Sequence, residues 1–159
     1  MKYIFATISL IVFSLNLFSQ TEKVSRTKFV LGLSIPEILH MGATYRISNS
    51  SLVGLNAGAG PTWGGLWPTI NLEHRLYIGK TNEAINRKVW FFRQGATIFT
   101  AAENSQRLAI TFTLGKDILF KNKSNGITID AGFFMQRPEA FSYYKSLKIW
   151  PALRFELFF

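Results

Sequence analysis

The chain has 159 residues, a formal net charge of +9, 48% hydrophobic residues and no cysteine. The lack of cysteine excludes disulfide bonds and the attachment of a lipid to an N-terminal cysteine. A strongly positive charge is typical of nucleic-acid-binding proteins, but the basic residues here fall in predicted turns and on predicted inward faces instead of along one stripe. We therefore expect no nucleic-acid partner.

Residues 1–19 predict a secretory signal peptide. A lysine at the second position is followed by an apolar run that ends at Phe18, and the small residue Ser19 precedes the predicted cleavage site. An uncleaved membrane anchor is the alternative, which Asn16 disfavours because it interrupts an already short apolar run. We expect residues 20–159 to form one exported domain.

Beyond the leader, apolar residues recur at every second position, which predicts β-strands. No apolar run approaches the ~20 residues that a membrane-spanning helix requires. The chain is long enough for eight strands of the ~9–11 residues that cross a membrane in a barrel, but too short for ten. The predicted strands are 28–35, 39–47, 53–60, 70–78, 88–100, 108–115, 127–136 and 146–159.

The first three predicted strands each have one apolar face and one face of small or polar residues. Turns separate them at Pro36-Glu37, where proline interrupts the strand, and at Asn49-Ser50, whose side chains hydrogen-bond the backbone in tight turns. We expect the apolar faces to point outward. They comprise Phe29, Leu31, Leu33, Ile35, Leu39, Met41, Ala43, Tyr45, Ile47, Val53, Leu55, Ala57 and Ala59.

A stretch rich in glycine and proline, residues 60–68, predicts a loop between the third and fourth strands. A second loop is predicted at residues 137–145, before the last strand. We expect the aromatic side chains of these two loops to form a contact surface for a partner. They are Trp63, Trp67, Tyr143 and Tyr144.

Two positions in the middle strands do not fit the alternation. His74 falls on the outward face of residues 70–78. In residues 88–100, an inward Arg93 sends Gln94 outward. A β-bulge, which inserts one extra residue into a strand, would remove the second conflict.

The final stretch, residues 146–159, shows the period of two most plainly. Apolar residues occupy every second position back from Phe159, and Arg154 and Glu156 lie on the other face. A cation in the middle of a lipid bilayer costs ~2–4 kcal/mol, so the charged face must point into a lumen. The sequence therefore predicts an all-β fold, an eight-stranded antiparallel up-and-down transmembrane barrel that follows a signal peptide.

The inward faces of the predicted strands carry both signs of charge. Because an eight-stranded barrel is barely wide enough for its own side chains, we expect these groups to form a hydrogen-bonded ionic plug, with inward glycines such as Gly32 and Gly54 leaving room for them. A narrow anion-preferring pore is the alternative. The predicted lumen residues are Arg46, Glu73, Arg75, Arg93, Asp130, Lys148, Arg154 and Glu156.

The alternating last strand with its terminal aromatic residue resembles the C-terminal signature of outer-membrane β-barrel proteins, in which Phe155, Leu157 and Phe159 would act as the assembly signal. Through pattern, leader and terminus, the chain is similar to small eight-stranded outer-membrane barrels of the OmpA-transmembrane or OmpX type. The resemblance implies outer-membrane integration, contact with membrane lipid and lipopolysaccharide, recognition by the barrel assembly machinery, and a structural or interaction role. It leaves the oligomeric state open.

A lipid-modifying enzyme, an acyl hydrolase or transferase, is an alternative within the same class of barrels. Such an enzyme needs a Ser/His/acid arrangement that activates a nucleophile. Ser34 and His40 lie near the outer ends of their predicted strands on the inward side, and Glu37 lies in the loop between them. These three are the candidate catalytic residues, although a hydrogen-bonded pair at the rim is the simpler interpretation.

A soluble, lipocalin-like barrel is a further structural alternative, and it would point its apolar residues into the lumen. The sequence shows no cluster of His, Asp or Glu at metal-ligand spacing and no phosphate-binding loop. We therefore expect no metal and no cofactor.

Overall fold

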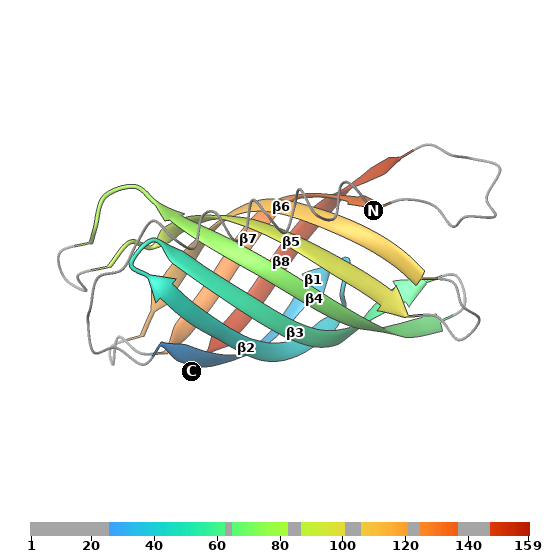
Figure 1. Cartoon of the computed structure of the whole chain (residues 1–159), viewed down its shortest axis with the longest axis horizontal. Helices are drawn as coiled ribbons and strands as arrows, with labels where there is room; N and C mark the ends of the chain where they lie inside the picture. The colour runs from blue at the N-terminus through green and yellow to red at the C-terminus, as the bar shows by residue number, and fades with distance from the viewer. Residues whose placement is uncertain (1–25, 63–64, 83–86, 101–105, 121–124, 137–146) are drawn as a thin grey trace.

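The computed structural model describes residues 26–62, 65–82, 87–100, 106–120, 125–136 and 147–159. They form a closed antiparallel barrel of eight strands, which confirms the prediction of an all-β, eight-stranded antiparallel barrel (Figure 1). The strands are β1 (Thr27–Ile35), β2 (Leu39–Ser48), β3 (Ser51–Thr62), β4 (Gly65–Ile78), β5 (Trp90–Thr100), β6 (Gln106–Leu119), β7 (Gly126–Gln136) and β8 (Lys148–Phe158). The described ranges contain no helix that is long and apolar enough to cross a membrane.

Each strand pairs with the next in the sequence, and β8 pairs with β1 to close the barrel. The carboxyl-terminal residue takes part in this closure, since the backbone N–H of Phe159 donates to the oxygen of Phe29 at 3.0 Å and the N–H of Phe29 donates back at 2.9 Å. We call the end where β1 begins and β8 finishes the terminal end, marked by the C in Figure 1, and the other the opposite end.

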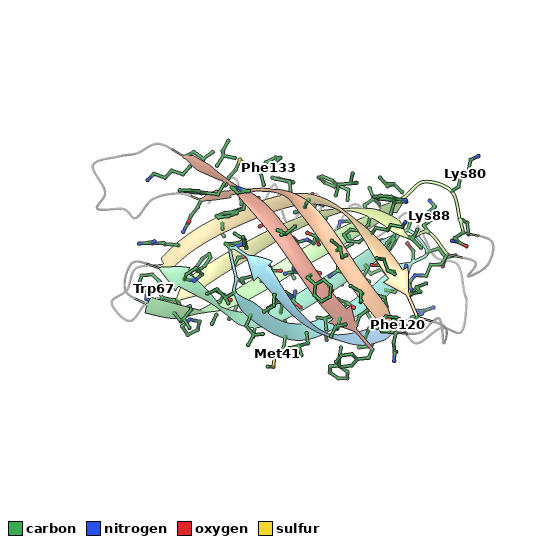
Figure 2. The ribbon with its side chains drawn as sticks, turned by 180° about the vertical axis from the view of Figure 1, so that it is seen from behind. Met41, Trp67, Lys80, Lys88, Phe120 and Phe133 are labelled. Carbon is green, nitrogen blue, oxygen red and sulfur yellow. The ribbon has the colours of Figure 1, made fainter. Side chains whose placement is uncertain are left out.

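The barrel has an apolar outside and a polar inside. On β8, Leu153 and Phe155 are 54% and 44% exposed, whereas Arg154 and Glu156 are 1% and 0% exposed. The same alternation holds along the other strands, and Met41 and Phe133 point away from the barrel wall in Figure 2. This distribution contradicts the soluble lipocalin-like alternative, which requires the apolar side chains inside.

Two small apolar clusters lie in the lumen, one toward each end. Leu52, Tyr77 and Phe91 form the cluster at the terminal end. At the opposite end, Phe99 packs with Ala109, Phe134 and Ala152, and Trp67 packs against this group. Between the two clusters the lumen contains charged and hydroxyl side chains, so an ionic layer lies between two apolar ones.

The prediction of a loop at residues 60–68 is wrong, because β3 and β4 both continue into this stretch. Gly60 pairs with Trp67 and Pro61 with Leu66, so that only residues 63–64 separate β3 from β4. This hairpin extends beyond its neighbours: the pairing of β2 with β3 ends at Ala59, and that of β4 with β5 begins at Thr69. Pro61 is tolerated there because no neighbouring strand would accept a hydrogen bond from the N–H that proline lacks.

The β-bulge that would have removed the conflict at Gln94 is absent. The pairing of β5 with both neighbours runs without a register shift through Arg93 and Gln94. Gln94 does face outward, and its Nε2 lies 3.1 Å from Nδ1 of His74, whose Nε2 lies 2.9 Å from the Ser51 hydroxyl. The two residues that broke the apolar alternation therefore hydrogen-bond each other across adjacent strands.

Several inward glycines make room for large polar side chains. Gly54 and Gly95 pair with Glu73 from either side. A Cβ added to Gly54 would lie 2.9 Å from Cγ of Glu73, whereas one added to Gly95 would have its nearest neighbour, the oxygen of Leu72, at 3.4 Å. Glycine is therefore sterically required at position 54 and not at position 95.

Gly54→Ala should lower the free energy of unfolding by about 1–3 kcal/mol, because Glu73 is held by its ion pairs and cannot move away from the added methyl group. Gly95→Ala, the matched control on the other side of the same residue, should stay within about 1 kcal/mol of the unmodified protein. Urea unfolding of the refolded protein, followed by tryptophan fluorescence, measures both. Equal losses in the two variants would contradict the steric argument.

Candidate functional site

Six of the predicted lumen residues form one ion-paired group, which we call the central cluster. Its members project inward from β4, β5, β7 and β8 and are at most 2% exposed. Because a buried charge is stable only when it is paired and hydrogen-bonded, the pairing of these groups decides whether the lumen can hold them. The central cluster consists of Glu73, Arg75, Arg93, Asp130, Arg154 and Glu156.

Glu73 contacts all three arginines of the central cluster. It accepts hydrogen bonds from Nε and Nη2 of Arg75 at 2.9 and 2.6 Å. Its other oxygen accepts from Nη1 of Arg154 and lies 3.5 Å from Nη1 of Arg93. One carboxylate thus joins guanidinium groups from three strands.

Glu156 and Asp130 complete the pairing. Glu156 accepts from Nη2 of Arg75 at 2.6 Å and from Nη1 of Arg154 at 3.1 Å. Asp130 accepts from Nη2 of Arg93 at 2.8 Å. Three carboxylates and three guanidinium groups therefore balance. The pairs Arg75–Glu156, Arg93–Asp130 and Arg154–Glu73 run across the lumen between strands that are not neighbours in the wall.

The three candidate catalytic residues lie together on the opposite-end side of the central cluster. The Ser34 hydroxyl lies 3.2 Å from Nδ1 of His40, and Nε2 of His40 lies 3.2 Å from Glu156. Glu37 turns inward from the β1–β2 connection and is 2% exposed. It accepts from the hydroxyls of Ser34 at 2.9 Å and Thr97 at 3.1 Å, and it lies 3.4 Å from Nη2 of Arg154.

This geometry adds two facts that the sequence pattern did not supply. Glu156, which is distant in sequence, is the carboxylate next to His40, whereas Glu37 is bonded to Ser34. Glu37 is also a part of the lumen network, although the sequence predicts only that it lies in the loop between two strands. No signal in the sequence shows that this connection folds inward.

A second polar group occupies the lumen at the terminal end, around Asp117. This carboxylate accepts from the Tyr77 hydroxyl at 2.8 Å, from Arg87 at 2.9 Å and from Thr128 at 2.9 Å. The guanidinium of Arg46, a predicted lumen residue, lies over the Tyr77 ring at 4.5 Å. The predicted sixth strand, residues 108–115, stops short of Asp117, whereas β6 continues to Leu119 and the same alternation places Asp117 inward.

The remaining predicted residues lie elsewhere. Lys148 is exposed at the opposite end of β8, away from the central cluster. Trp67 lies in β4, partly buried inside the opposite end, with the Arg107 guanidinium 5.2 Å from its ring. The other predicted contact residues, Trp63, Tyr143 and Tyr144, and the predicted signal peptide at residues 1–19 lie outside the described residues.

No group of three or more potential metal-ligating side chains occurs in the described part of the chain. Comparison of the chain with protein-family models, with curated proteins and with solved structures found no match. The inference of function therefore depends on the geometry of the barrel and its lumen.

Glu73→Gln should destabilise the protein by about 3–5 kcal/mol, because it leaves three buried guanidinium groups with too few carboxylates. Asp130→Asn should cost less, about 1–3 kcal/mol, since among the described residues Asp130 contacts no arginine other than Arg93 and one of its oxygens has no hydrogen-bond partner. Lys148→Gln, an exposed control, should change stability by no more than about 0.5 kcal/mol. Urea unfolding should reproduce this order, and similar values for all three would refute the ion-paired cluster.

Proposed function

We propose that this protein is an integral outer-membrane β-barrel, with a structural or interaction role and a lumen closed by its own side chains. The observation that carries the proposal is the inverted polarity of the barrel, since large apolar side chains such as Leu31, Leu72 and Leu114 are exposed all around it. Exposed apolar area costs about 25 cal/mol per Å² in water, whereas acyl chains accept it. Closure also pairs the backbone groups that lipid could not satisfy.

The last strand supports the outer membrane as the location. Phe155 and Leu157 are exposed on one face of β8, and Phe159, which follows the strand, is exposed too, so a folding factor could contact all three. Together with the predicted signal peptide at residues 1–19, this face supports export followed by recognition by the barrel assembly machinery. Membrane lipid and lipopolysaccharide would then be the contacts of the outer wall.

The contents of the lumen favour a closed barrel over an anion-preferring pore. A passing ion would have to separate the Phe99 cluster at the opposite end and then break the pairs of Glu73 with its arginines. The arginines of the central cluster are already neutralised by carboxylates. These groups therefore fill the lumen and link strands on opposite sides of the barrel.

Leu72→Arg should lower stability in lipid vesicles by about 2–4 kcal/mol, because this outward residue lies midway along β4 and its charge would sit near the bilayer centre. Ile78→Arg, on the same face at the end of β4, should cost only about 0–1 kcal/mol. Urea unfolding of vesicle-inserted protein measures the difference. If both changes are neutral and the purified protein stays dissolved without detergent, the membrane assignment fails.

A second candidate function, an acyl hydrolase or transferase, is favoured by the contacts of Ser34, His40 and Glu156. In this mechanism the Ser34 oxygen attacks the acyl carbonyl of a lipid ester and His40 takes its proton, while Glu156 holds the ring. The leaving alcohol recovers that proton. Water, or an acceptor alcohol, then releases the acyl group from Ser34.

Ser34→Ala tests this mechanism with little disturbance of packing. If the protein is an acyl hydrolase, release of fatty acid from phospholipid or lipopolysaccharide should fall by about 10³-fold or more, as for loss of a nucleophile. Ser51→Ala is the matched control, because Ser51 contacts the other histidine, His74, on the outer face. Absence of activity in the unmodified protein, or equal activity in both variants, would eliminate the enzyme.

A further inference from the structure

The terminal mouth of the lumen carries an excess of positive charge. The guanidinium carbons of Arg46 and Arg87 lie 4.5 and 5.9 Å from the Tyr77 ring, and Nζ of Lys28 lies 4.5 Å from the Phe158 ring. These three cations are close enough to repel one another. We use the name terminal mouth for these three basic residues and the rings beneath them.

The carboxylate that faces these cations, among the described residues, is Asp117, and its oxygens are already engaged. One oxygen accepts from the Tyr77 hydroxyl and from Arg87, and the other accepts from Thr128. Asp117 therefore offsets one of the two guanidinium charges of Arg46 and Arg87. The terminal mouth differs in this respect from the central cluster, where the guanidinium and carboxylate groups balance.

Two donors at the terminal mouth are buried and have no acceptor among the described residues. They are Nη2 of Arg46 and Nε of Arg87. A buried N–H of a cation that lacks a partner costs more free energy than an ordinary unmade hydrogen bond. The Tyr77 ring nevertheless holds the Arg46 guanidinium in place, so its unpaired donor is already positioned to bind an acceptor from a ligand.

We propose that the terminal mouth binds a phosphate-type oxyanion, with Arg46 and Arg87 as its direct ligands. Guanidinium groups suit this ligand because their planar donors match the oxygens of a phosphate. The oxyanion supplies both the missing charge and the missing acceptors. The source is either free phosphate or the headgroup of a phospholipid on the terminal side.

The proposed phosphate site requires only the barrel and its lumen, so a failure of the membrane assignment would not remove it.

Figure 2 shows Lys80 and Lys88 near the terminal end, with Lys80 extending away from it. Lys80 is exposed and belongs to no contact described for the terminal mouth. Lys80→Gln therefore removes a positive charge from the same end without touching the site, which makes it the matched control.

The experiment measures binding of inorganic phosphate to refolded full-chain protein in a non-ionic detergent, by phosphorus NMR. Arg46→Gln, Arg87→Gln and Lys80→Gln are compared after folding has been verified by the electrophoretic shift between heated and unheated samples. Saturable binding should weaken by about tenfold or more in each arginine variant, through loss of a charge-assisted hydrogen bond, and should be unchanged in Lys80→Gln. Rising salt should weaken it further.

The lipid arm uses native mass spectrometry of protein exchanged into micelles that contain phosphatidylglycerol. Retention of this lipid that depends on both arginines, without binding of free phosphate, would support the proposal with a headgroup as the source. Binding of neither probe, or binding that Arg46→Gln and Arg87→Gln leave intact, overturns it. The Arg46 variant retains the Arg87–Asp117 contact, so a loss of binding in this variant is separable from a collapse of the mouth.

Discussion

The pairing of buried charges across the lumen is the constraint on which the rest of the structure depends. Glu73 alone joins Arg75, Arg93 and Arg154, which come from β4, β5 and β8. The contacts of Arg154 with Glu73 and of Arg75 with Glu156 exist only when the barrel is closed, because they join β8 to β4 on the opposite side. Closure in turn excludes water, which makes each unpaired charge costly. The barrel and its ionic filling are therefore mutually dependent and should form together.

The two apolar clusters in the lumen strengthen this dependence. The Tyr77–Phe91 pair, with ring centroids 5.6 Å apart, lies on the terminal side of the central cluster, and the Phe99 group lies on the other side. Both reduce the access of water to the ion pairs between them. Coulombic attraction is stronger at low dielectric, so the apolar layers increase the strength of contacts in which they take no part.

The alternation of residue types was sufficient to predict the strands and their outward faces, because a period of two is a property of the local sequence. It failed where tertiary pairing decides the outcome. The breaker-rich residues 60–68 form a hairpin because two strands extend past their neighbours, and Glu37 enters the lumen because Arg154 and Thr97 are there to bind it. Contacts between distant residues of this kind leave no periodic signal.

The hydroxyl proton of Ser34 separates the structural and catalytic interpretations of the same site. A hydroxyl donates one hydrogen bond, and the acceptors within reach of Ser34 are the backbone and side-chain oxygens of Glu37 and Nδ1 of His40. A nucleophile requires donation to a neutral His40, whereas a structural hydroxyl donates to Glu37 and accepts from His40.

Charge balance distinguishes these two arrangements. Glu37 adds a fourth carboxylate to the three of the central cluster, against three guanidinium groups. If Ser34 donates to Glu37, both nitrogens of His40 donate, one of them to Glu156, and the positively charged ring brings the buried group to neutrality. If Ser34 donates to His40, the ring is neutral and one negative charge remains in excess. The electrostatics of the lumen therefore favour the structural arrangement, in which Ser34 and His40 stabilise the plug.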